Sequence, residues 1–264
     1  MKRVFYISLV LFSNIFSYSC DKEVAKVEKA SLHFDVTEID NFFKKYVADG
    51  KVKYEDAKHD NALNTYIEQI KSFEPYSIED VNERLVFWIN AYNAFTIKLV
   101  LDYYPIESIL DIESQTGVSP WSINFIEMAG GRKFSLDEIE KKIIIKKYKD
   151  PRIHYVLVCA AESCPVLISK AYTIENLNEL FDTQASFFLN DKSKNRINSE
   201  DKTIELSTIY KWYKSDFTDK DSTVINHIKK YINETDKDFI AKNNVEETNY
   251  LDYSWKLNDY KKTE

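Results

Sequence analysis

The chain has 264 residues, of which 44% are hydrophobic and 30% charged, and it carries a net charge of -7 at pH 7. This composition is typical of a folded globular protein and excludes a disordered, collagen-like or polytopic membrane chain. The acidic balance disfavours nucleic-acid binding, which needs a concentrated positive patch, and the lack of GxGxxG and GxxxxGKS/T patterns disfavours the common nucleotide sites.

The first twenty residues are typical of an export signal. Two basic residues precede an apolar run over 4–16, which is shorter than the roughly 20 residues that a membrane span needs. The run leads to Ser19 and Cys20, and a cysteine after a small residue is similar to the processing site of bacterial lipoproteins, where the thiol is acylated. Ordinary cleavage nearby, which would release a soluble secreted protein, is the alternative, because Ser17 stands where such signals usually have Leu.

This pattern sets the expected organisation of the chain. We expect residues 1–19 to be a signal peptide and residues 20–34 to be a tether attached to lipid through Cys20. Residues 35–258 are expected to form the folded domain, followed by a tail over 259–264. The expected location is the cell envelope, on the periplasmic or the surface face of a bacterial membrane, with that membrane as a partner through the anchor.

Helices are predicted by hydrophobic spacing through most of the domain. They are expected over residues 37–48, 61–73, 81–104, 135–148, 174–189, 207–213 and 223–232. The helix over 81–104 is apolar on nearly every side around its centre, so we expect it to be the buried central helix.

Strands are predicted at fewer places. The β-branched and apolar run Ile153–Cys159 has the composition of a buried strand, and 196–197 with 203–206 flank a polar turn as a hairpin. Residues 250–257 are expected to be extended. The predicted class is therefore α+β, a predominantly helical single domain around a small, partly antiparallel sheet.

The segment around two cysteines is the main candidate for chemistry. Cys159 and Cys164 are spaced C-x4-C without the further ligand pair of a structural zinc site, so we expect no metal and no cofactor. Cys159 is interpreted as a buried core thiol, whereas Cys164 follows the predicted strand in a turn that can face a cleft. Three states of Cys164 remain open: a nucleophile paired with His154, a disulfide with Cys159, and an inert free thiol.

Two amides interrupt the apolar central helix. Asn90 and Asn93 share one face, and each buried amide costs about 1–3 kcal/mol unless it is hydrogen-bonded. They either orient His154, as the third member of a Cys-His-Asn arrangement, or cap backbone groups of a neighbouring loop, and the second interpretation is favoured. Glu140 is a candidate site acid.

These polar groups are predicted to meet in one place. The residues expected to converge in a single pocket are Asn90, Asn93, Arg152, His154, Glu162 and Cys164. By contrast, His33, His59 and His227 lie in polar surroundings, so we expect them at the surface.

Five segments resemble a known family, the domain of unknown function 547. They are FWINAYNAFTIKLVLDYYP (87–105), FSLDEIE (134–140), DPRIHYVLVCAAESCPVL (150–167), LSTIYKWYKSDF (206–217) and YSWKLN (253–258). The resemblance implies a family found in bacterial exported proteins and lipoproteins and, in eukaryotes, as a module fused to others, with no reaction firmly attached to it. Lys141 departs from the family pattern, which usually has His at that position.

Two functions of different classes follow from these residues, and whether the protein is an enzyme stays open. The favoured one is an envelope interaction module that binds an unknown protein or peptide through a tyrosine-rich surface, because the sequence contains no independent base, metal or oxyanion signature. The alternative is a Cys-dependent hydrolase or acyltransferase, with Cys164 as nucleophile, His154 as base and Asn90 or Asn93 as the orienting amide.

Overall fold

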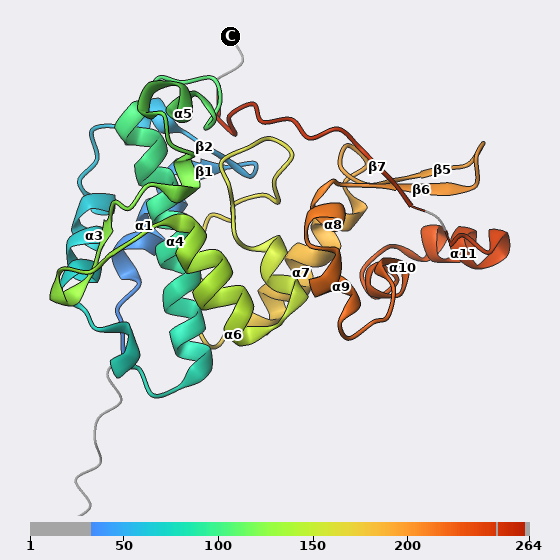
Figure 1. Cartoon of the computed structure of the whole chain (residues 1–264), viewed down its shortest axis with the longest axis horizontal. Helices are drawn as coiled ribbons and strands as arrows, with labels where there is room; N and C mark the ends of the chain where they lie inside the picture. Colours follow the sequence, from blue (N-terminus) through green and yellow to red (C-terminus); the bar gives the residue numbers. More distant parts are fainter. Residues whose placement is uncertain (1–32, 247, 262–264) are drawn as a thin grey trace, which may run out of the picture. The chain divides into compact units, whose positions relative to one another are not determined.

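Helices dominate the residues that the computed structural model describes, 33–246 and 248–261 (Figure 1). The helices are α1 (Thr37–Tyr46), α2 (Tyr54–Ala57), α3 (Ala62–Ser72), α4 (Val81–Tyr103), α5 (Asp111–Thr116), α6 (Lys146–Tyr148), α7 (Leu177–Asn190), α8 (Ile209–Trp212), α9 (Lys214–Thr218), α10 (Val224–Ile228) and α11 (Glu234–Asn243). The predicted signal peptide, Cys20 and most of the predicted tether lie outside these residues. Within them, no helix combines the length and apolar character that a membrane crossing requires.

The strands are short and form small sheets. They are β1 (Val47–Ala48), β2 (Lys51–Val52), β3 (Ile126–Glu127), β4 (Lys133–Phe134), β5 (Arg196–Asn198), β6 (Thr203–Leu206) and β7 (Thr248–Tyr250). β1 pairs with β2 and β3 with β4, both antiparallel. The predicted hairpin is confirmed as β5 and β6, which pair antiparallel with Ile197 opposite Ile204, and β7 adds to β6 in parallel. The α+β class and its small, partly antiparallel sheet are therefore confirmed.

Helix α4 is the buried centre of the larger of two hydrophobic clusters. Its side chains are buried without interruption from Leu85 to Ile97, as its apolar sequence predicts. The Asp80 carboxylate begins the helix by accepting hydrogen bonds from the N–H groups of Asn82 and Glu83. Helix α7 joins the two clusters, because its first half packs into the larger one and its second half into the smaller one.

The predicted helix over 135–148 is present, but its central part is a π-helix. Residues Glu138–Ile145 form the π-helix, which continues directly into α6. Two adjacent pairs, Ile139 with Glu140 and Ile143 with Ile144, lie on its buried side. Glu140 is therefore directed toward the interior rather than toward solvent.

The strand predicted over Ile153–Cys159 is wrong. Residues Pro151–Tyr155 form a 3₁₀ helix, and residues 157–159 belong to neither a helix nor a strand. The reason lies just upstream: the Asp150 side chain accepts the N–H of Arg152, and Pro151 stands at the first helical position, where its fixed φ favours a helical turn.

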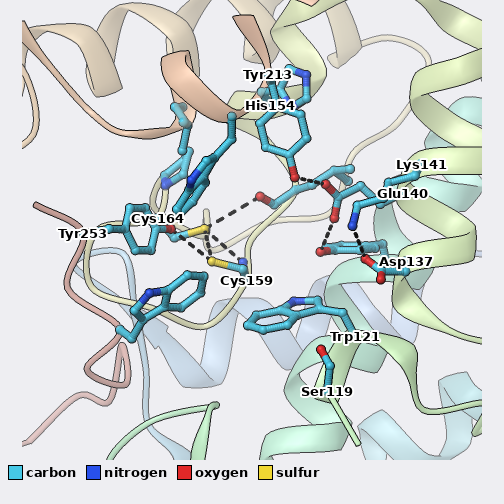
Figure 2. Close-up of a pocket in the computed structure, with 16 residues that line it drawn as sticks. Ser119, Trp121, Asp137, Glu140, Lys141, His154, Cys159, Cys164, Tyr213 and Tyr253 are labelled. Atoms are coloured by element: carbon cyan, nitrogen blue, oxygen red, sulfur yellow. Dashed lines mark hydrogen bonds and ion pairs between the residues drawn. The ribbon is translucent and has the colours of Figure 1, made fainter. Parts of the chain in front are cut away.

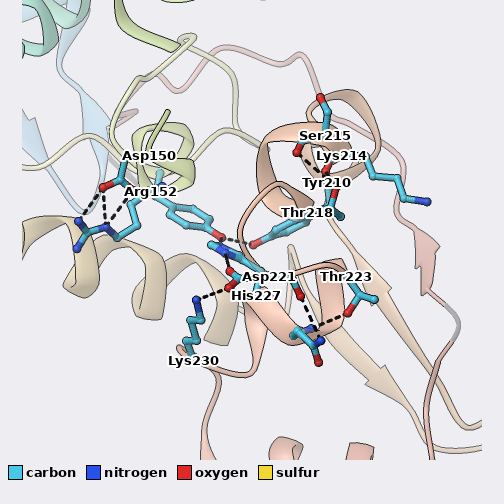
Figure 3. A network of polar contacts seen from close by, with 12 residues as sticks. Asp150, Arg152, Tyr210, Lys214, Ser215, Thr218, Asp221, Thr223, His227 and Lys230 are labelled. Carbon is cyan, nitrogen blue, oxygen red and sulfur yellow. Dashed lines mark hydrogen bonds and ion pairs between the residues drawn. The ribbon is translucent and has the colours of Figure 1, made fainter. Parts of the chain in front are cut away.

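A buried polar network anchors this 3₁₀ helix in the smaller hydrophobic cluster (Figure 3). The Tyr155 hydroxyl lies 2.9 Å from His227 Nε2 and 2.9 Å from the Tyr210 hydroxyl, and His227 Nδ1 lies 2.9 Å from Asp221 Oδ2. His227 is only 1% exposed, so its expected surface location is wrong. Burial lowers the pKa of its imidazole, and the contacts with Asp221 and Tyr155 provide the partners that a buried imidazole needs.

Candidate functional site

A pocket of about 430 Å³ lies where the two hydrophobic clusters meet (Figure 2). Its lining contains both cysteines of the C-x4-C pair together with many aromatic and four charged or titratable side chains. These residues are Cys159 and Cys164, then Tyr92, Trp121, Trp212, Tyr213, Tyr253 and Trp255, then Asp137, Glu140, Lys141 and His154. The combination of thiols, carboxylates and aromatic rings in one cavity makes it the candidate active site.

The two amides of α4 hold the ends of the loop that carries the cysteines. Asn93 Nδ2 donates to the Val156 carbonyl at 2.9 Å, and Asn93 Oδ1 accepts the N–H of Val158 at 2.9 Å. Asn90 makes the same pair of bonds to the N–H and the carbonyl of Tyr172. Both amides thus cap backbone of neighbouring loops, which is the interpretation that the sequence favoured, and neither lines the pocket.

The C-terminal segment covers the cysteine loop. The Glu162 N–H donates to the Lys256 carbonyl at 2.8 Å, and the Asn258 N–H donates to the Ala160 carbonyl at 3.0 Å. Ala160 has a φ of 63°, a left-handed conformation that is costly for a residue with a Cβ and that turns the chain directly after Cys159. This pairing brings Tyr253 and the residues beside it against the thiols.

Both cysteines are free thiols, and their sulfur atoms lie 2.9 Å apart. This separation exceeds the roughly 2.0 Å of a disulfide bond, so the two sulfur atoms are in contact but are not bonded. The Cys159 N–H donates to the Cys164 sulfur at 2.9 Å, and the Tyr253 hydroxyl lies 3.2 Å from the Cys159 sulfur. Cys159 is partly exposed in the pocket, whereas Cys164 is 4% exposed.

The surroundings shift the pKa values of the two thiols in opposite directions. The pKa of Cys159 is lowered, first by the hydrogen bond from the Cys164 thiol and further by that from the Tyr253 hydroxyl, since both stabilise the thiolate. The pKa of Cys164 is raised, mainly because burial disfavours its thiolate. The pair therefore consists of one partly exposed thiol with a lowered pKa and one buried thiol with a raised pKa.

Glu140 is a buried carboxylate held by neutral groups. Its Oε1 accepts the Tyr213 hydroxyl at 2.6 Å, and its Oε2 accepts the Tyr92 hydroxyl at 2.8 Å. Among the described contacts no cation pairs with it, because Lys141, the lysine of the pocket, pairs with Asp137 at 2.7 Å.

His154 lines the pocket but does not pair with a thiol. Its Nε2 lies 2.9 Å from Asp216 Oδ2, which lowers the pKa of Asp216, and its ring packs 4.1 Å from that of Tyr213. The described contacts of the Cys164 sulfur are with Cys159, Tyr253 and the Leu157 carbonyl. The predicted dyad of Cys164 and His154 is therefore not formed in this structure.

The remaining predicted residues lie elsewhere. Arg152 pairs with Asp150 at 2.7 Å and with Asp182 at 2.9 Å, beside the 3₁₀ helix that replaces the predicted strand. Glu162 lies 3.4 Å from the Lys256 ammonium, in the turn that pairs with the C-terminal segment. Of the six residues expected to converge, His154 and Cys164 line the pocket, and Glu140, proposed separately as a site acid, lines it as well.

Sequence reasoning assigned no site role to the aromatic wall or to Cys159. The wall is formed by Trp121, Trp212, Tyr253 and Trp255, and these four rings are called the aromatic wall below. One feature of the sequence indicated part of this wall. In an extended segment, residues two apart share a face, so Tyr253 and Trp255 are expected to point the same way. In the part of the chain that the structure describes, no cluster of three or more His, Cys, Asp or Glu side chains has a metal-binding arrangement.

Comparison with known proteins finds a family match over part of the chain and no reaction. Residues 77–189 match the model of a family described as "Protein of unknown function, DUF547", so this segment is similar to that family. The matched segment includes α4, the π-helix with Glu140 and the cysteine loop. No curated protein and no solved structure matches the chain.

Proposed function

We propose that the pocket is a thiol–disulfide exchange site in which Cys159 attacks and Cys164 resolves. The observation that carries the proposal is the pair itself: two free sulfurs 2.9 Å apart, one facing an open pocket with a lowered pKa and one buried with a raised pKa. Dithiol oxidoreductases need this asymmetry, because the attacking sulfur must be an accessible thiolate while the second must wait as a thiol.

The reaction needs a substrate disulfide and, for return to the dithiol, an external dithiol reductant. The Cys159 thiolate attacks one substrate sulfur, which breaks the substrate S–S bond and releases the other sulfur as a thiolate that takes a proton from water. The product is a mixed disulfide between Cys159 and the substrate. Cys164 then gives its proton to solvent and attacks the Cys159 sulfur, which forms the Cys159–Cys164 disulfide and releases the second substrate thiolate. Two electrons pass from the protein to the substrate.

Replacing Cys164 with Ser should trap the mixed disulfide. The experiment uses the full chain with Cys20→Ser, which leaves Cys159 and Cys164 as its two cysteines. When the reduced protein meets 2-hydroxyethyl disulfide, intact mass spectrometry should show the loss of two hydrogens in the parent. Cys164→Ser should instead gain one mercaptoethanol group, because no resolving thiol remains.

Cys159→Ser is the matched control for this trap, and it should react slowly or not at all. Rapid reaction of Cys159→Ser through Cys164, or a stable mixed disulfide in the parent, would contradict the assignment of the two roles.

A second candidate function, binding of a protein or peptide without reaction, is favoured by the exposure of the aromatic wall. Trp212 is 48% exposed and stacks on Trp255 with ring centres 5.8 Å apart. Exposed aromatic rings are common anchors of binding interfaces. Under this hypothesis no disulfide exchange is expected from the parent chain, so the trapping experiment separates the two functions.

We also propose that the chain is exported and anchored to lipid through Cys20 in the cell envelope. The support is the short apolar run that ends at Ser19 and Cys20, and an oxidising compartment outside the cytosol would supply disulfides for the exchange. Cys20→Ala is expected to move the protein from the membrane fraction to the soluble fraction, as measured by immunoblotting. Unchanged fractionation of this variant would rule out the anchor.

A further inference from the structure

The charge of the pocket is unbalanced at Glu140. Asp137 and Lys141 pair with each other, and His154 is matched by Asp216, so these groups leave no positive charge for Glu140. Its two hydrogen bonds come from the neutral hydroxyls of Tyr92 and Tyr213. A buried carboxylate without a cation is costly, and a positively charged ligand would remove that cost.

Glu140 also has room for further hydrogen-bond donors. A carboxylate offers about four acceptor positions on its two oxygens. Each oxygen accepts one tyrosine hydroxyl, so about two positions remain, and the residue lines the pocket in which a ligand would lie. The two tyrosine hydroxyls hold the Glu140 carboxylate in one orientation. This reduces the entropy cost of ordering that side chain when a ligand binds.

Another part of the pocket lining is formed by rings that attract cations. The Trp255 ring centre lies 5.4 Å from that of Trp121, 5.8 Å from Trp212 and 4.6 Å from Tyr253. The faces of Trp and Tyr rings attract ammonium and guanidinium groups. Figure 2 shows the thiols between Tyr253 on one side and Glu140 on the other.

We propose that the pocket selects disulfides that carry a cationic group, an ammonium or guanidinium, beside the S–S bond. The cation would lie between the Glu140 carboxylate and the aromatic wall while the disulfide reaches Cys159. An anionic substrate would be repelled by Glu140, and Lys141 is already engaged by Asp137. This inference rests on the exchange function proposed above and names its substrate class.

Three small disulfides test the selectivity. They are cystamine with two ammonium groups, 2-hydroxyethyl disulfide with none, and 3,3′-dithiodipropionate with two carboxylates. Each rate with the reduced Cys20→Ser chain is divided by the rate of free N-acetylcysteine with the same disulfide, which removes differences in intrinsic reactivity. The normalised rate with cystamine should exceed that with 2-hydroxyethyl disulfide about tenfold, the worth of one good charge-assisted contact. The normalised rate with 3,3′-dithiodipropionate should be the lowest of the three.

Glu140→Gln should bring the ratio of cystamine to 2-hydroxyethyl disulfide to within about twofold of unity, because the charge is removed and the shape kept. The ratio of the two rates, rather than either rate alone, tests the proposal, because the charge of Glu140 also raises the pKa of Cys159 and therefore affects the rate with every disulfide. Glu234→Gln is the matched control: this side chain is 84% exposed at the start of α11, and its loss changes the net charge equally. It should leave the ratio unchanged.

A binding measurement without chemistry keeps the two proposals separable. Three of the four tryptophans line the pocket, so n-butylammonium, and not n-butanol, should change the tryptophan fluorescence of the parent, and Glu140→Gln should weaken this response. Exchange that proceeds without preference for cystamine, with no Glu140-dependent binding of butylammonium, overturns the cation inference alone. Failure of all three disulfides to react overturns the exchange function, and Glu140-dependent butylammonium binding would then still support the cation site.

Discussion

Asn93→Ala is expected to lower the free energy of unfolding by about 2–6 kcal/mol. The substitution leaves the Val156 carbonyl and the Val158 N–H without a partner in the core, and each such group costs about 1–3 kcal/mol. Whole domains are stable by only about 5–15 kcal/mol, so the change should be obvious in urea unfolding followed by tryptophan fluorescence. Asn90→Ala should behave similarly, because it frees both polar groups of the Tyr172 backbone.

The exposed Asn249 supplies the control for Asn93. Its amide makes one contact of 3.4 Å with Thr203 at the surface, so Asn249→Ala should change the stability by less than about 0.5 kcal/mol. An equally small effect of Asn93→Ala would show that water or a rearranged loop replaces the amide. The hydrogen bonds would then not be what positions the cysteines.

The second large effect concerns the reactivity of the two thiols. In the reduced Cys20→Ser chain, iodoacetamide should label Cys159 at least about 100-fold faster than Cys164 at pH 7, because alkylation requires an accessible thiolate. A lowered pKa means that the thiolate persists as the pH falls, so the labelling rate of Cys159 should reach half its maximum below the ordinary value of about 8.5. Peptide mass mapping at a series of pH values measures both quantities.

Tyr253→Phe provides the mechanistic control for this labelling. It removes a hydroxyl that donates to the Cys159 thiolate but keeps the ring, so the midpoint of the pH profile should move upward. Guanidinium-unfolded protein should label both cysteines at similar rates. If Cys164 reacted first in the folded chain, the assignment of the attacking thiol would have to be reversed.

The fold was predictable where one local pattern determines the structure. Burial on every face of α4 follows from its apolar sequence, and the β5–β6 hairpin follows from alternation around a polar turn. The run Ile153–Cys159 misled because a short apolar run fits a buried strand and a buried turn equally well. The structure of this run is determined by the side chain of Asp150 at one end and, at the other, by the amide of Asn93, which is distant in sequence.

The candidate site was predictable only in part, for a related reason. Cys164 and His154 were identified because polar residue types interrupt apolar sequence, and Glu140 because it lies just past the first turn of a predicted helix. All three line the pocket. Cys159 was given no site role because the run Ile153–Cys159 was interpreted as a strand, in which Cys159 points away from His154 and into the core. The aromatic wall depends on pairing between residues about 90 positions apart, and no local pattern encodes such a contact.

The pairing of the cysteine loop with the C-terminal segment has a consequence for biosynthesis. Ser163 and its partner Ser254 are 91 residues apart, which at about 5–20 residues per second corresponds to roughly 5–18 seconds of synthesis. During this interval Cys159 and Cys164 have been synthesised, but the C-terminal segment that covers them has not. A nascent chain therefore exposes the pair to any oxidant before a selective pocket exists. The pocket, with Tyr253 and Trp255 in its lining, is therefore complete only when the C-terminal segment has docked.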